Sequence, residues 1–335
     1  MTAMKKHLKL FVALATALVL ASCNERGLDV PSVTYQVAFN VSGDEVATRS
    51  TVLADAGAVS QVTYYFCNAQ GAVVDAVASS QSQVLRNFSA GTYTVYAVVN
   101  SGAAVGDYAT SAAIKAATRS LTSETAGGFS MFGSAAFSVP ADDACTVRVY
   151  RLVSMVELDR VSVNFSAKPH LAELTFTVDS IYLINAVGAV TFEDNTSASH
   201  ATWHNMRWPQ AGSLEALLCD AVGATVTQGT PYITPHYFYC YQNNTVTDSR
   251  SATWDARYTR LVVACTLGGR RTYYPVDIHH PSGKLLRNCR YVVSNIVVTG
   301  YGSNAPDLPV PEDEDYSYSV TVLPWDGLHE VDEQF

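Results

Sequence analysis

The residue best placed to do chemistry is Cys23, a thiol that follows a short apolar segment near the start of the chain. Three lysines within residues 5–9 precede apolar residues 10–19, and Leu20-Ala21-Ser22 stands directly before the cysteine. A positive region, a short apolar run and small residues before a cut are typical of a signal peptide. A cysteine at the cut favours a bacterial lipoprotein, so we expect the Cys23 thiol to carry diacylglycerol. Acyl chains of this kind hold a protein to a membrane with about 0.8 kcal/mol of binding free energy per buried CH₂. The alternative is an ordinary signal peptide followed by a chance cysteine.

A second group with possible chemistry is the pair His200 and His204, which lies near Glu193 and Asp194. Histidines four residues apart can share a metal ion if the segment is helical. A polar loop is the alternative that we favour, so we expect no metal and no cofactor. The sequence also lacks H-E-x-x-H, G-x-S-x-G, a P-loop and a Rossmann glycine pattern. It therefore predicts a protein that is not an enzyme.

Aromatic residues in polar, loop-like stretches suggest a second function. Trp203, Trp208 and Tyr258 could form a platform that stacks on sugar rings. Packing at the rim of a sheet is the alternative for these side chains. A glycan-binding or adhesin lipoprotein of the outer membrane is accordingly the second functional hypothesis.

The composition excludes one class of partner. Residues 1–22 hold three of the 21 basic residues and none of the 30 acidic ones, so the remaining 313 residues carry 18 against 30, a net charge of −12. Nucleic acid is excluded, because its binding needs a basic surface. The 19 tyrosines and many valines and threonines favour β-strands. No other stretch is apolar enough to predict a membrane span.

Six cysteines remain after Cys23, and they are scattered with no C-x-x-C pair. This spacing indicates neither a zinc site nor a thioredoxin-type motif. An oxidising envelope permits disulfides. Most of these cysteines nevertheless stand in apolar strand-like runs, so we expect buried thiols.

Alternation of apolar and polar residues with a period of two runs through most of the chain and predicts an all-β fold. The first such stretch places five apolar side chains on one face: Val33, Tyr35, Val37, Phe39 and Val41. Further strands are expected at residues 62–66, 92–99, 129–132, 146–165, 174–183, 232–241, 259–266, 272–278 and 290–298. Residues 103–128 predict a long loop with a short helix near 111–118. The length predicts about two domains, each a β-sandwich, with a boundary at 140–143.

The C-terminal part differs in composition. Residues 303–315 are rich in proline and acid and predict an extended, solvated linker. A strand is expected next, with four side chains on one face: Tyr316, Tyr318, Val320 and Val322. Residues 326–335 are acidic and only sparsely apolar.

Several segments together resemble the Bacteroidales fimbrillins, the lipoprotein-derived subunits of type V pili. They are residues 90–100, 151–153, 178–185, 239–243, 273–276, 287–291, 300–306 and 320–325. Their order along the chain carries the resemblance more than any single string does.

The resemblance implies two transthyretin-like β-sandwich domains in tandem and export to the outer membrane as a lipoprotein. It implies that an Arg-specific protease removes the first strand and that a strand of another pilus subunit fills the groove. Arg49-Ser50 is the expected cut, because a cut at Arg26 spares the strand. The expected parts are a signal peptide (1–22), a lipidated propeptide (23–49), two sandwiches (50–143 and 144–302) and a linker with the C-terminal strand (303–335).

Removing a strand with about four inward apolar residues exposes side chains worth roughly 6–12 kcal/mol, which rivals the stability of a domain. Capture of another strand by β-augmentation restores that burial without ATP. The segment from Tyr316 onward is expected to join subunits, either as the joining strand or as the strand that positions it. Three questions stay open: whether the subunit is a stalk, tip or anchor, whether the polymer is a homo- or a hetero-polymer, and whether host glycans or proteins are partners.

Overall fold

The computed structural model describes residues 34–43, 58–81, 83–195, 199–210, 214–248, 254–311 and 316–325. Cys23, Val33, Arg49 and Ser50 lie outside the described residues. The described strands are β1 (Thr34–Gly43), β2 (Val62–Asn68), β3 (Val73–Ser79), β4 (Gln83–Ser89), β5 (Gly91–Val99), β6 (Thr118–Ser120), β7 (Met131–Val139), β8 (Ala144–Arg151), β9 (Val153–Leu158), β10 (Val161–Val163), β11 (Phe176–Ile184), β12 (Ala186–Val187), β13 (Ala189–Thr191), β14 (Trp203–His204), β15 (Cys219–Val226), β16 (His236–Tyr241), β17 (Arg260–Leu267), β18 (Arg270–Asp277), β19 (Cys289–Val298) and β20 (Tyr316–Pro324). The described helices are short: α1 (Ser111–Ala116), η1 (Leu121–Ser123), α2 (Pro169–Ala172) and α3 (Glu215–Leu218).

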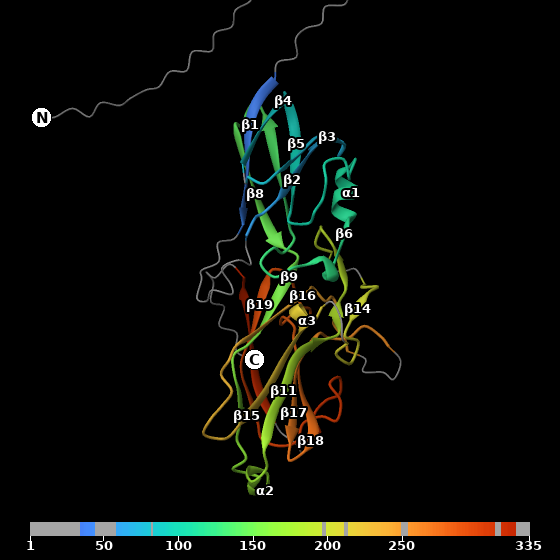
Figure 1. Ribbon diagram of the computed structural model, residues 1–335. Helices are drawn as coiled ribbons and strands as arrows, with labels where there is room; N and C mark the ends of the chain where they lie inside the picture. Colours follow the sequence, from blue (N-terminus) through green and yellow to red (C-terminus); the bar gives the residue numbers. More distant parts are fainter. Residues whose placement is uncertain are drawn as a thin grey trace, which may run out of the picture. The chain divides into compact units, whose positions relative to one another are not determined.

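The first large sheet has seven strands in the order β3-β2-β5-β7-β8-β1-β4 (Figure 1). β7 and β8 pair at only two positions, Met131 with Arg151 and Phe132 with Tyr150, so the sheet is nearly divided there. Phe39 of β1 packs against rings of β2 and β7, which are not its neighbours in the strand order. The sheet therefore folds over on itself and encloses a core, as the layers of a β-sandwich do.

Two further sheets enclose the larger core. One has the order β10-β19-β9-β16, with β20 on the other side of β19, and the second has the order β15-β11-β17-β18. β9 and β10 share one edge of β19, since β9 pairs with residues 290–293 and β10 with residues 296–298. Ring contacts cross between the two sheets, for example from Tyr274 on β18 to Tyr316 on β20 at 5.8 Å.

The structure confirms the all-β fold class and most of the expected strands, and a helix lies within the loop where one is expected. Residues 146–165, expected as one very long strand or as two strands joined by a bulge, form β8, β9 and β10. Residues 140–143 connect β7 to β8, two strands of one sheet, and the chain passes to the next sheet at Leu152. The sequence pattern missed β3, β4 and β15, which carry many polar and small residues.

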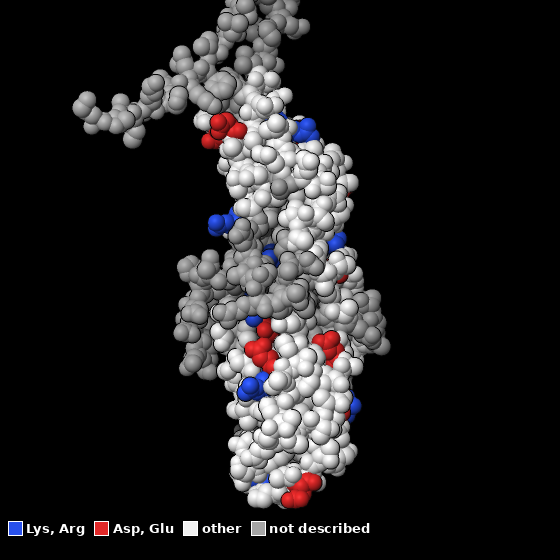
Figure 2. Space-filling view, turned by 60° about the vertical axis from the view of Figure 1, so that its left-hand side comes forward, with Lys and Arg blue, Asp and Glu red and all other residues white. Residues whose placement is uncertain are grey.

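The six described cysteines form no disulfide, and four of them are buried: Cys67, Cys145, Cys240 and Cys265. Burial raises the pKa of the Cys240 thiol to about 12, which keeps it protonated. Among the described residues, no helix combines the length and apolarity needed to cross a membrane. On the face shown in Figure 2, the charged side chains of the described residues are few and scattered, as the charged content of 15% predicts.

Candidate functional site

The strand β1 lies between two partners in the seven-stranded sheet. It pairs antiparallel with β4 over Thr34–Asn40 and parallel with β8 over Ala38–Gly43 (Figure 1). The side chains of Asn40 and Thr146 add a hydrogen bond of 3.0 Å, with the threonine hydroxyl as donor. β1 is therefore the middle strand of the layer β4-β1-β8, although it comes first in the described chain.

The inward face of β1 is the one that the sequence predicts, but it is shorter than expected. Val37 and Phe39 are 0% exposed and Val41 is half-buried. Tyr35 has the same parity but is 37% exposed, so it lies at the rim of the core. At about 1.5–3 kcal/mol each, the two fully buried side chains contribute roughly 3–6 kcal/mol, less than four inward residues would.

Phe39 is at the centre of an aromatic cluster. Its ring lies 4.7 Å from that of Phe66 on β2, 4.8 Å from that of Phe137 on β7 and 5.8 Å from that of Phe88 on β4. All three contacts are edge-to-face, an arrangement that aromatic pairs prefer. The ring of Phe88 also lies 5.2 Å from that of Phe137, so the three partner rings contact one another. We call Phe66, Phe88 and Phe137 the aromatic socket.

Removing β1 has a definite geometric result. β4 and β8 each lose a neighbour and lie about two strand spacings apart, roughly 10 Å. Backbone donors and acceptors on both facing edges lose their partners, and the aromatic socket loses its occupant. The result is a groove that another β-strand can fill with both backbone pairing and side-chain burial.

The strand β20 has a different position. It pairs with β19 along nearly its whole length, from Tyr316 opposite Val298 to Pro324 opposite Cys289. Among the described residues, no strand pairs with its other edge. Tyr316, Val320 and Val322 pack against the larger core, whereas Tyr318 is 40% exposed.

Trp325 fixes the end of β20. Its side chain is 3% exposed, and its ring stacks on Tyr239 at 6.0 Å and lies near Phe129 at 6.3 Å. The guanidinium of Arg151 lies 4.8 Å from the ring centroid, which is the geometry of a cation–π interaction. The backbone N–H of Trp325 donates to the carbonyl of Asn288 at 3.2 Å. The chain is therefore held at the point where the described residues end.

The segment before β20 is held at Ser303 and Asp307, which corrects the expectation of a solvated linker for this part; residues 312–315, which carry four of its acids, lie outside the described residues. Ser303 is 2% exposed and exchanges two backbone hydrogen bonds with Tyr273 on β18. Asp307 is 5% exposed, and its two carboxylate oxygens lie 2.5 Å from Arg260 Nη1 and 2.9 Å from Arg257 Nη1. Asn185 donates a further hydrogen bond to it at 2.9 Å. The proline-rich, acidic composition did not predict this, because one of the acids, Asp307, is a buried ion-pair partner.

Arg260 is the centre of this cluster. It is 1% exposed and contacts Asp248 and Asp277 as well as Asp307. Burial lowers the pKa of Arg260, but the carboxylates more than offset this and leave the pKa above its usual value. A fully charged guanidinium therefore ties the segment before β20 to β17.

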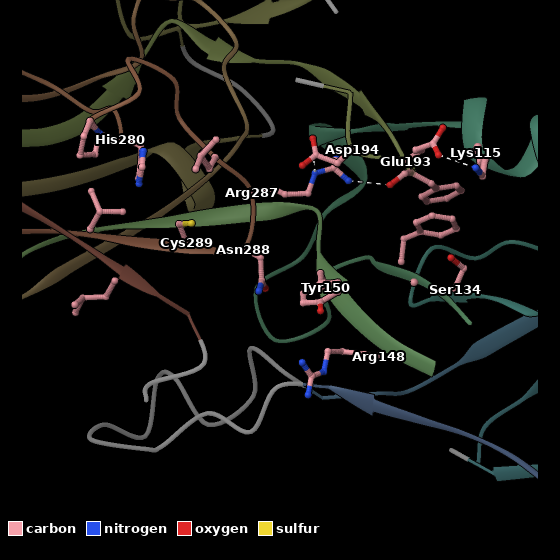
Figure 3. Close-up of a pocket in the computed structure, with 17 residues that line it drawn as sticks. Lys115, Ser134, Arg148, Tyr150, Glu193, Asp194, His280, Arg287, Asn288 and Cys289 are labelled. Atoms are coloured by element: carbon pink, nitrogen blue, oxygen red, sulfur yellow. Dashed lines mark hydrogen bonds and ion pairs between the residues drawn. The ribbon is translucent and has the colours of Figure 1, made fainter. Parts of the chain in front are cut away.

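A hollow of about 720 Å³ is lined in part by residues of β7, β8 and β20 (Figure 3). Among its lining residues, Lys115 and Glu193 point toward one another, with Nζ and Oε1 2.8 Å apart, and Arg287 Nε lies 3.7 Å from Asp194 Oδ1. The hydrogen bond to Glu193 raises the pKa of Lys115, and burial lowers that of Arg287. Because these charges neutralise one another, they favour a structural role.

The histidine pair does not lie on a helix. His204 is in β14, and His200 precedes that strand and accepts a hydrogen bond from the backbone of Asn244 at 3.2 Å. Burial lowers the pKa of both imidazoles. No group of three metal-ligating side chains is found in the part of the chain that the structure describes.

The three aromatic residues of the glycan hypothesis contact three different rings. Trp203 lies against Trp254 at 5.6 Å, Trp208 against Tyr273 at 5.7 Å and Tyr258 against His279 at 5.3 Å. Trp208 is 47% exposed. These separate contacts favour packing at the rims of strands.

The sequence matches no family model and no curated protein. Solved structures do match. A candidate cell adhesion protein from Bacteroides eggerthii DSM 20697 superposes with a TM-score of 0.63 at 18% identity, over 89% of this chain and 98% of that chain. A fimbrilin from Porphyromonas gingivalis W83 gives 0.61 at 19% identity, over 87% and 97%. A candidate cell adhesion protein from Parabacteroides distasonis ATCC 8503 gives 0.63 at 15% identity, over 89% and 99%. At these identities the likeness establishes the fold, and the expected resemblance to the fimbrillins is confirmed at that level.

Proposed function

We propose that this chain is a structural subunit of a cell-surface pilus, a fimbrium, that contributes to adhesion and assembles by strand exchange. It is exported as a precursor lipidated at Cys23 and held at the outer membrane. An Arg-specific protease cuts between Arg49 and Ser50, β1 leaves with the lipid, and a strand of another pilus subunit enters the groove.

The position of β1 carries this proposal. A single cut after Gly43 and before Ala58 separates β1 from the rest of the described chain, and Arg49 is in that interval. The cut strand is the middle one of its layer, so its loss opens a groove rather than trimming an edge. The fold shared with a fimbrilin and with candidate cell adhesion proteins supports the same role.

The sequence leaves two roles open for the C-terminal part: β20 is the joining strand itself, or it positions the joining strand. We propose the second role. β20 positions the joining segment rather than leaving its own sheet, because Trp325 holds the chain directly after it and Asp307 holds the chain nine residues before its start. The joining role then falls to residues 326–335, which lie outside the described residues.

The test is to express the chain with an Arg-specific protease and to compare Arg49→Ala with Arg26→Ala. Arg49→Ala should give a lipidated monomer of precursor mass. Arg26→Ala, the matched control, should be cut and form SDS-resistant ladders as the unchanged chain does. Ladders of normal length from uncut Arg49→Ala would refute the link between cleavage and assembly.

Lipidation is tested separately. An alkyne fatty acid fed to the cells should label the unchanged chain and leave Cys23→Ser unlabelled. Equal labelling of the two would show that Cys23 is not the attachment site.

A further inference from the structure

We propose that the groove selects a partner strand by its aromatic socket, and that this strand comes from a chain of different sequence. The selected strand carries an aliphatic side chain at the position of Val37 and a phenylalanine two residues later, at the position of Phe39. This inference rests on the proposed function, since it concerns what enters the groove after β1 has left.

The socket is built from strands that stay. Phe66, Phe88 and Phe137 belong to β2, β4 and β7, none of which is part of the removable segment. Their ring centroids lie within 6.4 Å of one another, so the three rings also support each other through contacts that do not involve Phe39. A small side chain in the socket leaves a void, which close-packed interiors tolerate poorly. A charged or hydroxyl-bearing side chain there meets three phenyl rings and loses its hydration.

Residues 326–335 do not meet this requirement. Their sequence is Asp-Gly-Leu-His-Glu-Val-Asp-Glu-Gln-Phe. The inward positions of a strand are two residues apart, and no register within this decapeptide places apolar side chains at both fully buried positions. Leu328 is followed two residues later by Glu330, Val331 by Glu333, and Phe335 is preceded by Glu333. Each register that seats one of these apolar residues inward puts an acid or a histidine at a neighbouring inward position.

The strand β20 has the right alternation but is also a poor occupant. Placing Tyr318 in the socket would put Tyr316 at the position of Val37 and bury a phenolic hydroxyl among phenyl rings. Tyr316, Val320 and Val322 already pack in their own core. Neither segment of the C-terminal part therefore suits the groove of its own chain, which is why we assign the partner strand to a chain of different sequence.

The experiment uses the full chain with a cut site for a sequence-specific protease placed within residues 44–57, so that it does not depend on Arg49 as the natural site. After cutting, the N-terminal fragment is exchanged for a fluorescent peptide of residues 33–43. Unlabelled peptides then compete, with anisotropy as the readout: the same sequence, its variants Phe39→Ala, Phe39→Tyr and Tyr35→Ala, and the decapeptide 326–335.

The unchanged peptide should compete fully. Phe39→Ala should compete roughly 100-fold or more weakly, and Phe39→Tyr roughly tenfold or more weakly. Tyr35→Ala, at an exposed position, should change competition only a few-fold, and the decapeptide should not compete. If Phe39→Ala competes like the unchanged peptide, or the decapeptide competes within about tenfold of it, the socket does not select the partner. If the fluorescent peptide itself does not bind, the removable strand is wrong, and the proposed function fails with the socket.

Discussion

The strands β1 and β20 share a sequence pattern but differ in how they are held. Both alternate apolar and polar residues, and both come next to segments rich in acid. β1 pairs on both edges and seats Phe39 in the aromatic socket, yet a single interruption between β1 and β2 would separate it from the chain. β20 pairs on one edge among the described residues, but Trp325 holds the chain directly after it and Asp307 holds the chain nine residues before its start.

If the chain assembles by strand exchange as proposed above, this difference means that the attachment of a strand, more than its pairing, decides which strand exchanges. A strand with two paired edges can leave as a unit once its covalent link is cut, and its departure creates a binding site. A strand at an edge with anchored ends stays in place even though half of its backbone groups have no strand partner among the described residues. Changes that weaken either the socket or the anchors should therefore act on one strand and spare the other.

The largest effect is expected at Phe39. Phe39→Ala in the uncut chain removes the ring from the centre of the socket and should lower the free energy of unfolding by about 3–5 kcal/mol. Tyr35→Ala, on the same face but 37% exposed, is the matched control and should cost about 1 kcal/mol or less. Denaturant unfolding of both variants measures the difference, and equal losses would mean that β1 is not seated as the structure shows.

The anchor before β20 gives the next largest effect. Asp307→Asn leaves Arg257 and Arg260 buried with one carboxylate fewer and should lower the free energy of unfolding by about 3 kcal/mol. Hydrogen exchange should accelerate in residues 303–311 and in β20, and it should stay unchanged in β1. Asp255→Asn, at an exposed carboxylate, is the control. Faster exchange in β1 as well would show that the two strands are not held independently.

The sequence alone predicted both strands, β1 and β20. Alternation predicted β1 and β20 with nearly their observed bounds, because each has one face in a core and the other toward solvent. It did not predict β4, the antiparallel partner of β1, since Arg86 and Asn87 interrupt its apolar residues. The sequence therefore could not predict the aromatic socket, because Phe66, Phe88 and Phe137 stand on three strands whose pairing no local pattern specifies.

The sequence did not predict the anchors of β20, Asp307 and Trp325, for a different reason. Asp307 stands in a stretch whose composition is typical of a solvated linker, and its arginine partners are about 50 residues earlier in the chain. Local composition reports the average environment of a segment, but a single buried ion pair depends on where distant side chains meet. Trp325 after Pro324 offered the one local signal, since a tryptophan at a strand end is often buried.

The anchor after β20 should have a smaller effect when it is changed conservatively. Trp325→Phe keeps an aromatic ring near Tyr239 but offers Arg151 a weaker cation–π partner and less area, so the loss should be about 1 kcal/mol. Trp208→Phe, at a residue 47% exposed, should change stability by less than about 0.5 kcal/mol. Thermal unfolding resolves the two. A Trp325→Phe chain as stable as the unchanged one would remove this residue from the anchors.

The smallest effect concerns the sheet that carries β20, and it depends on pH. Glu157 on β9 is 5% exposed, and its Oε2 lies 2.7 Å from Nε of Arg290 on β19. Arg290 in turn pairs with Leu323 of β20. Burial raises the pKa of this carboxyl to about 7, a hydrogen bond with Asp159 acts in the same direction, and Arg290 opposes both. Because the folded state holds this proton more tightly than the unfolded chain, Glu157 contributes stability that is fully present below its ordinary pKa and is lost as the pH rises through about 7.

Glu157→Gln cannot titrate and should remove that contribution to the pH dependence. Between about pH 5 and about pH 8, the unchanged chain should therefore lose stability relative to Glu157→Gln, as measured by thermal unfolding at both values. Glu173→Gln, at an exposed glutamate, is the control and should follow the unchanged chain. A Glu157→Gln chain that loses stability in parallel with the unchanged chain would contradict the raised pKa. The inward face of β1 carries no charged residue among those described. We therefore expect the pH dependence of stability that Glu157 causes to act on the sheet of β19 and β20 and not on β1.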